Sequence, residues 1–284
     1  MLDSHVQRTA LGDVLKLRLR SAPFPHASRQ NGYRYHDTQY QADPHYVDST
    51  VAVFIPPGIR RDLPVNLVFF FHGWNSSVDD VQQRFDLYRQ FAQSGVPALL
   101  VLPELAWNAP DSSGGKLEDP GGFTRMVTEL LEALRGTGEI GISAPGNIVL
   151  AGHSGAYRVI AQILTNADLA ANVKEVWLFD ALYDFADQYG AWIDRAATRF
   201  VSISASDGEQ TTDVDKLIAS LREEGVACDL ERDDPLIDPW TLHSRVVFLK
   251  SDTDHFGVVA ARREFRRLLE TSPALAAAPP AIAM

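Results

Sequence analysis

The sequence predicts an α/β protein in which a mostly parallel sheet lies between two layers of helices. Short apolar segments of strand length alternate along the chain with longer segments in which apolar residues have helical spacing. Most of the strand candidates are almost wholly apolar, as strands buried on both faces of a sheet must be. Such alternation is typical of parallel strands linked by helices. The 284 residues, with 45% hydrophobic content, are enough to bury the core of a single domain, residues 1–284.

Eight strand candidates follow one another along the chain. In the first, residues 14–20, Leu15, Leu17 and Leu19 alternate with basic residues, which predicts an edge strand with one face in water. The other seven are residues 50–56, 66–73, 97–104, 147–154, 175–181, 200–206 and 246–252. Helices are expected near residues 78–94, 122–135, 155–167, 185–197, 212–224 and 257–270.

The remaining stretches are expected to be irregular. Besides the edge strand, the segment 1–48 has no clear periodicity, residues 229–242 form a loop before the last strand, and residues 273–284 form a frayed tail. The long loop 105–121 leaves the carboxyl end of the fourth strand, where parallel sheets usually bind ligands. We therefore expect this loop to lie over the site, with Trp107 and Asn108 in contact with substrate. The loop could equally be a connection exposed to solvent that does not contact substrate.

Composition and charge exclude several classes of function. A net charge of −11 argues against a nucleic-acid or anionic-membrane partner, because both require a concentrated basic surface. The single cysteine, Cys228, excludes an intrachain disulfide and a cysteine cluster for zinc. No stretch approaches the ~20 apolar residues of a membrane span, and the first residues lack the pattern of an export signal. These features lead us to expect a cytoplasmic protein without a metal site.

The segment AGHSGAYR, residues 151–158, predicts a sharp turn from a strand into a helix, with Ser154 at its apex. A nucleophile on such a turn needs small residues two positions before and after it, because larger side chains would collide with the adjoining backbone. Gly152 and Ala156 occupy those positions. The N–H of Gly155 can donate to an oxyanion, and the positive end of the following helix points to the same place. This pattern predicts a nucleophilic serine, although a serine between glycines is also a common structural turn.

A histidine follows the last predicted strand, which completes the chain order of nucleophile, acid and base. His255 lies between that strand and the last helix, at the carboxyl end of the sheet, and is the expected general base. Two aspartates compete as the acid that orients it. Asp207 follows the seventh strand and is the favoured candidate, while Asp180 follows the sixth strand and is the alternative. Each could instead serve a local structural role, Asp207 as a helix cap and Asp180 as a partner for Arg158.

The order of these motifs resembles that of the α/β-hydrolase superfamily over about residues 49–271. The resemblance implies a three-layer α/β-hydrolase fold with a mostly parallel eight-stranded sheet, and a Ser–His–acid triad that uses no metal or organic cofactor. By the same resemblance, the segment FFFHGWNSS, residues 69–77, is the loop that binds the oxyanion, with the backbone N–H of Trp74 as the second donor. The side chain of His72 is expected to brace this loop.

The activity that the resemblance implies is hydrolysis of a small-molecule carboxylic ester through an acyl-enzyme formed on Ser154, with His255 as general base and acid. Three other readings stay open. The same residues could cleave an amide or peptide, or could transfer the acyl group to an alcohol instead of water. A binding module without catalytic activity is disfavoured, because the nucleophile, the histidine, the acid candidates and the oxyanion turn are all present in the sequence.

Overall fold

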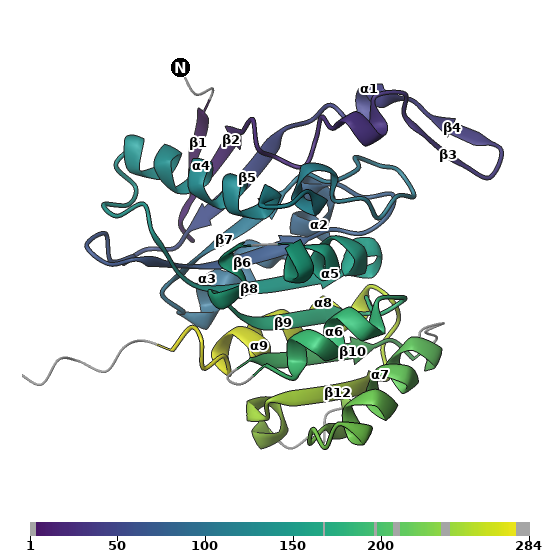
Figure 1. Cartoon of the computed structure of the whole chain (residues 1–284). Helices are drawn as coiled ribbons and strands as arrows, with labels where there is room; N and C mark the ends of the chain where they lie inside the picture. The colour runs from purple at the N-terminus through teal and green to yellow at the C-terminus, as the bar shows by residue number, and fades with distance from the viewer. Residues whose placement is uncertain (1–3, 167, 196–197, 207–210, 234–238, 277–284) are drawn as a thin grey trace, which may run out of the picture.

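The computed structural model describes residues 4–166, 168–195, 198–206, 211–233 and 239–276. A ten-stranded sheet forms its centre, with the strand order β1-β2-β5-β7-β6-β8-β9-β10-β12-β11 (Figure 1). All pairs from β7 to β11 are parallel, whereas β1, β2, β5 and β7 pair in antiparallel fashion. The strands are β1 (Ser4–Arg8), β2 (Asp13–Arg18), β5 (Thr50–Ile55), β6 (Val65–Phe71), β7 (Ala98–Pro103), β8 (Pro145–His153), β9 (Val173–Phe179), β10 (Arg199–Ser204), β11 (Asp229–Asp233) and β12 (Val246–Ser251).

Helices cover both faces of this sheet, which confirms the predicted three-layer architecture (Figure 1). One face carries α4 (Gly122–Gly136), α5 (Tyr157–Asn166), α6 (Ala186–Ile193) and α7 (Thr211–Glu223). The other carries α2 (Val78–Phe85), α3 (Leu87–Ser94), α8 (Gly257–Ala260) and α9 (Glu264–Glu270). Each interface is a continuous apolar core, because the strands between the two layers have large apolar side chains on both faces.

All eight predicted strands are present, but the sheet contains ten strands and not the predicted eight. Strand β1 pairs outside β2, so residues 14–20 contain the second strand of the sheet and not its edge. Strand β11 forms the opposite edge, within the segment 229–242 that was expected to be a loop. Both missed strands are short and polar, and therefore lack the apolar pattern that marks a buried strand.

The N-terminal segment and the tail are also more ordered than expected. Residues 1–48 include a 3₁₀ helix (Ala27–Arg29), a hairpin of β3 (Tyr33–Tyr35) and β4 (Thr38–Tyr40), and the short α1 (Ala42–His45). In the predicted tail, Leu275 is fully buried and the Ala274 N–H donates to the buried carboxylate of Glu175. Residues 277–284 lie outside the described part of the chain.

The loop 105–121 is largely buried, including Asp111, Ser112 and Ser113. The Arg29 guanidinium from the N-terminal segment donates to both carboxylate oxygens of Asp111, at 2.6 and 3.0 Å. Only 14% of the Arg29 side chain and 4% of the Asp111 side chain are exposed. This buried, two-pronged ion pair fastens the N-terminal segment to the loop.

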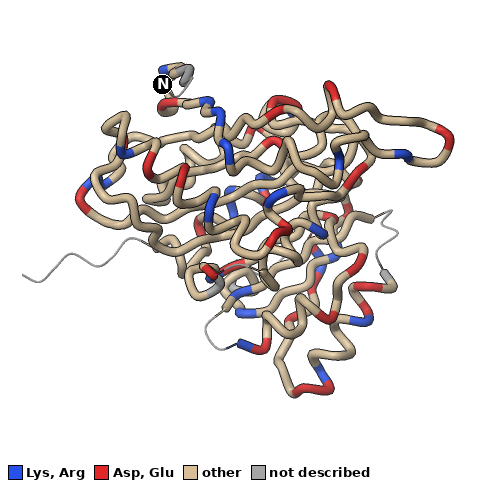
Figure 2. Tube along the Cα trace, turned by 45° about the horizontal axis from the view of Figure 1, so that its top comes forward, with Lys and Arg blue, Asp and Glu red and all other residues tan. Residues whose placement is uncertain are grey.

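Charged residues of both signs are interspersed over the molecule. In the view of Figure 2 the Lys and Arg positions alternate with Asp and Glu positions and do not gather on one side. No cluster of Lys and Arg positions stands out in that view, in keeping with the excess of acidic residues. Across the described segments, every helix is too short or too polar to cross a bilayer.

We predict that Arg29→Ala lowers the free energy of unfolding by roughly 3 kcal/mol, because it leaves the Asp111 carboxylate buried without its partner. Denaturant unfolding measures this change. Arg60→Ala is the matched control, since the Arg60–Asp62 pair is two-thirds exposed on both sides and its loss should have no measurable effect. Equal stabilities for the Arg29 and Arg60 variants would show that the buried pair does not hold the loop.

Candidate active site

The candidate site forms where neighbouring parallel strands end at the same edge of the sheet. Phe71 at the end of β6 is in register with Gly152 of β8, and His153 of β8 is in register with Phe179 of β9. The turns that follow these three strands therefore lie side by side. Strand β12 is parallel to β10, and β10 is parallel to β9, so β12 ends at the same edge of the sheet. The segment that follows β12 contains His255.

Ser154 lies on the predicted sharp turn between β8 and α5. Its backbone has a φ of 57°, in the left-handed region that non-glycine residues rarely adopt. A Cβ added at Gly152 would lie 2.7 Å from the Cβ of Ala156, so the small residues on both sides of the serine are required by space. The strained turn predicted from the sequence is confirmed.

The turn after β6 packs directly against this serine. A Cβ at Gly73 would lie 2.6 Å from the Cβ of Ser154 and 2.9 Å from the backbone nitrogen of Gly155, so only glycine allows the two turns to touch. His72 braces this turn as expected. Its Nε2 atom accepts a hydrogen bond from the Leu105 N–H at 2.9 Å, and the ring is almost fully buried.

The indole of Trp74 lies over the nucleophile turn. A Cβ at Gly155 would lie 2.4 Å from the Trp74 Cδ1 atom, which means that the ring rests against the Gly155 backbone. The indole N–H donates to Ser112 Oγ at 2.7 Å, and the Tyr35 ring packs edge-on against the indole at 5.3 Å. Within the described segments, the backbone N–H of Trp74 donates to no protein acceptor.

His255 forms a short hydrogen bond with a buried carboxylate. Its Nδ1 atom lies 2.5 Å from Asp180 Oδ2, and the Asp180 side chain is 2% exposed. Since the carboxylate can only accept, Nδ1 carries the proton and Nε2 is left with a lone pair. The other Asp180 oxygen accepts from the Ala205 N–H at 2.8 Å, and Asp180 itself has a φ of 45°. These contacts hold the Asp180 carboxylate against Nδ1 of the His255 ring, opposite Nε2.

The carboxylate that contacts His255 is that of Asp180, the alternative acid of the sequence prediction. Asp207 lies outside the described residues, but the Nδ1 position of His255 is already occupied by Asp180. The physical reason is the backbone after β9. The left-handed turn at Asp180, tied to the chain after β10 through the Ala205 N–H, directs the carboxylate toward His255.

A second histidine, His153, contacts both the backbone and the ring of His255. The His153 Nε2 atom donates to the backbone carbonyl of His255 at 2.7 Å, and the two ring centroids are 4.4 Å apart. Burial, with a smaller contribution from the neighbouring His255, lowers the pKa of His153 to about 3. His153 is therefore neutral near pH 7 and adds no positive charge beside His255. The role of His153 could not be predicted from the sequence, since a histidine directly before the serine carries no chemical signal by itself.

Ser154 and His255 open into one cavity of about 370 Å³. Trp107 and Asn108, expected to contact substrate, are not among the residues that line it. Trp107 is held elsewhere, because its N–H donates to the His45 carbonyl and its carbonyl accepts from the His45 ring. The Asn108 N–H donates to the Ser76 carbonyl. The loop 105–121 instead reaches the site through Ser112, the partner of the Trp74 indole.

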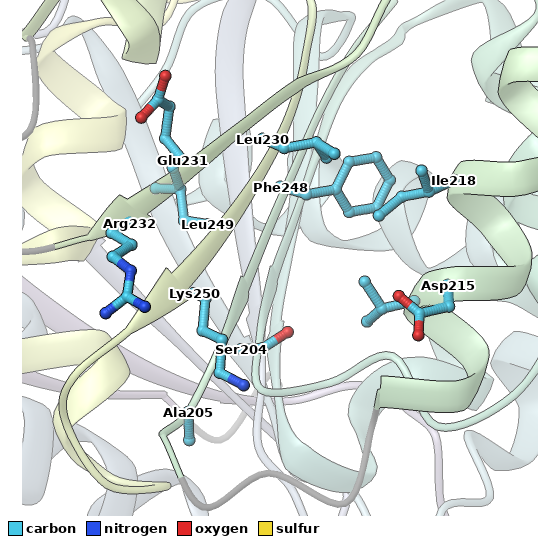
Figure 3. Close-up of a pocket in the computed structure, with 11 residues that line it drawn as sticks. Ser204, Ala205, Asp215, Ile218, Leu230, Glu231, Arg232, Phe248, Leu249 and Lys250 are labelled. Carbon is cyan, nitrogen blue, oxygen red and sulfur yellow. The ribbon is translucent and has the colours of Figure 1, made fainter.

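A larger cavity, of about 420 Å³, lies at the far edge of the sheet between α7 and the strands β10, β11 and β12 (Figure 3). Phe248, Leu230 and Ile218 are among its apolar lining residues, and its charged residues are balanced in sign. It contains neither Ser154 nor His255. In the described part of the chain, no group of three or more His, Cys, Asp or Glu side chains is arranged to hold a metal ion.

Comparisons with known proteins place this arrangement in a structural context. No family model matches the sequence, and no curated protein matches it. Solved structures with a similar fold include a feruloyl esterase module from Clostridium thermocellum, with a TM-score of 0.53 and 11% identity over 78% of this chain and 82% of that one.

An S-formylglutathione hydrolase from Agrobacterium tumefaciens gives a TM-score of 0.54 and 12% identity over 94% of this chain and 98% of that one. A ferulic acid esterase gives 0.54 and 12% over 80% and 92%. With this likeness, the sheet order and the turn at Ser154, the chain has the α/β-hydrolase fold that the sequence predicted.

Proposed function

We propose that this protein is a serine hydrolase that cleaves a small carboxylic ester through an acyl-enzyme on Ser154. The observation that carries the proposal is the hydrogen bond between His255 Nδ1 and the buried Asp180 carboxylate. The same histidine lines a cavity together with Ser154, which lies on a strained turn. A surface histidine would not need a buried acid to set its tautomer. The solved structures with the same fold, which are described as esterases and a hydrolase, fit this activity.

The proposed reaction has two halves. His255 Nε2 takes the proton of the Ser154 hydroxyl as its oxygen attacks the ester carbonyl, and the collapse of the tetrahedral intermediate transfers that proton to the departing alcohol. A water molecule, deprotonated by His255, then attacks the acyl-enzyme. The acid leaves, and the proton returns to Ser154. Asp180 holds the imidazole in the reactive tautomer and stabilises its charged form in both halves.

The backbone N–H groups of Gly155 and Trp74 are the proposed donors to the oxyanion. Gly155 follows the nucleophile, and Trp74 follows Gly73, whose Cα lies against Ser154 and the Gly155 nitrogen. Backbone donors on packed turns need no reorientation when the charge forms on the oxygen. Each such donor contributes roughly 3 to 4 kcal/mol to stabilisation of the transition state.

Ser154→Ala should reduce the turnover number for p-nitrophenyl esters by more than about 10⁴, because the attacking oxygen is removed. The same variant should no longer be labelled by a fluorophosphonate probe, while its melting temperature stays close to that of the wild type. Residual activity within tenfold of the wild type would refute Ser154 as the nucleophile.

Asp180→Asn should lower the turnover number by about 10⁴, because an amide cannot hold the same imidazole tautomer or stabilise its charge. Asp207→Asn is the matched variant and should keep activity within a fewfold of the wild type. Circular dichroism checks that both variants are folded. The opposite pattern of activities would return the role of the acid to Asp207.

Gly155→Ala should lower kcat/KM by roughly 10², since the new methyl group would meet the Trp74 indole and displace an oxyanion donor. Gly136→Ala is the control, because a Cβ at this helical position meets no atom within 4 Å. It should keep full activity. If both variants are equally active, the indole does not hold the oxyanion turn in place.

A further inference from the structure

The cavity at Ser154 has one charged side chain in its lining, that of Arg84. Of the eleven residues that line it, Arg84 is the only arginine or lysine, and none is an aspartate or glutamate. Its remaining walls are apolar or neutral. The chain as a whole carries a net charge of −11, so a cavity whose wall carries a cation and no carboxylate differs from the rest of the protein.

The exposed side chain of Arg84 packs on an aromatic ring and, within the described segments, pairs with no carboxylate. Its guanidinium carbon lies 4.2 Å from the centroid of the Phe256 ring, a cation–π contact. The residue belongs to the last turn of α2, whose free carbonyl groups favour a positive charge. In the described part of the chain Arg84 makes no ion pair, whereas Arg89, on the next helix, pairs with Asp86 at 2.8 Å.

The position of Arg84 relative to His255 indicates which part of a substrate it would meet. In the reaction proposed above, His255 gives its proton to the leaving group, so that group lies beside the imidazole. Phe256 follows His255 directly, with its ring centroid 5.2 Å from the imidazole, and Arg84 lies over the Phe256 ring. A leaving group that extends from His255 across Phe256 therefore reaches the guanidinium.

We propose that Arg84 is a specificity-determining residue that binds an anionic group, a carboxylate or phosphate, on the alcohol part of the ester. A guanidinium forms two-pronged hydrogen bonds with both groups. The excess of acidic residues repels anions at long range, and the local cation offsets this repulsion at the point of binding. The inference rests on the proposed function, since it is that reaction which places the leaving group beside His255.

The test compares two acetate esters, 4-acetoxybenzoate and its methyl ester, whose leaving groups are an anion and its neutral methyl ester, and follows release of acetate in the wild type, Arg84→Gln, Arg84→Glu and the control Arg89→Gln. We expect Arg84→Gln to lower the ratio of kcat/KM for the anionic ester to that for the neutral ester by roughly tenfold, the size of one hydrogen bond to a charged group. Arg84→Glu should lower it further, and Arg89→Gln should leave it unchanged. Added salt should reduce the preference of the wild type.

A second pair, phenyl hydrogen glutarate and phenyl hexanoate, carries the charge on the acyl part. A preference that depends on Arg84 for this pair alone would overturn the assignment to the leaving group. A lower melting temperature of Arg84→Gln with the first ratio unchanged would show that the residue only packs on Phe256, which also overturns the proposal.

Binding of 4-hydroxybenzoate to the Ser154→Ala protein separates this proposal from the proposed function, because it requires no turnover. Replacing Arg84 by Gln in that background should weaken the binding about tenfold, whereas replacing Arg89 should not. Equal binding in the two double variants would overturn the role of Arg84, even if the wild type hydrolyses esters. If the wild type hydrolyses no ester but binding still depends on Arg84, the proposed function is refuted. The assignment of Arg84 to the leaving group is then refuted as well, because it rests on that reaction.

Discussion

The close approach of two backbone turns governs the arrangement of the candidate site. The turn after β6 and the turn after β8 touch at Gly73 and Ser154, where an added Cβ would lie 2.6 Å from the serine Cβ. The two strands are adjacent and parallel and end at the same edge of the sheet, so the turns that follow them are in contact. Because main-chain atoms provide both the serine's position and the proposed oxyanion donors, the geometry does not depend on freezing flexible side chains.

Support for these turns comes from distant parts of the sequence. The Trp74 indole rests on Gly155 and donates to Ser112, in a loop whose neighbouring Asp111 pairs with Arg29 of the N-terminal segment. On the other side of the serine, Asp180 is linked to the chain after β10 through the Ala205 N–H. The site thus joins the two halves of the sheet, and the N-terminal segment forms part of its framework.

The sequence was sufficient for the features that depend on local pattern. The apolar runs located the buried strands, and the small residues around Ser154 located its turn, because in both cases steric and solvation constraints act on neighbouring residues. The position of His255 followed from the order of elements. All three are visible without knowledge of which strands are adjacent.

The features that the sequence did not determine depend on spatial neighbours. Asp180 and Asp207 both follow apolar strands, and the contact of Asp180 with His255 depends on the turn at Asp180 and on its bond from Ala205, which no sequence pattern shows. Trp107 has the right chain position for a substrate contact, but its backbone is bonded to His45, 62 residues away in sequence. The proposed role of Arg84 likewise depends on a ring, Phe256, that lies beyond the last strand in the sequence.

The two short strands at the edges of the sheet have a consequence for association between molecules. A free edge offers unpaired backbone groups to which a strand of another molecule can add. Here one edge is β11, in which exposed Leu230 lies among Asp229, Glu231 and Arg232, and the other is β1, in which exposed Val6 precedes Gln7 and Arg8. An incoming strand would have to desolvate the charged side chains, which opposes edge-to-edge aggregation of a large apolar sheet.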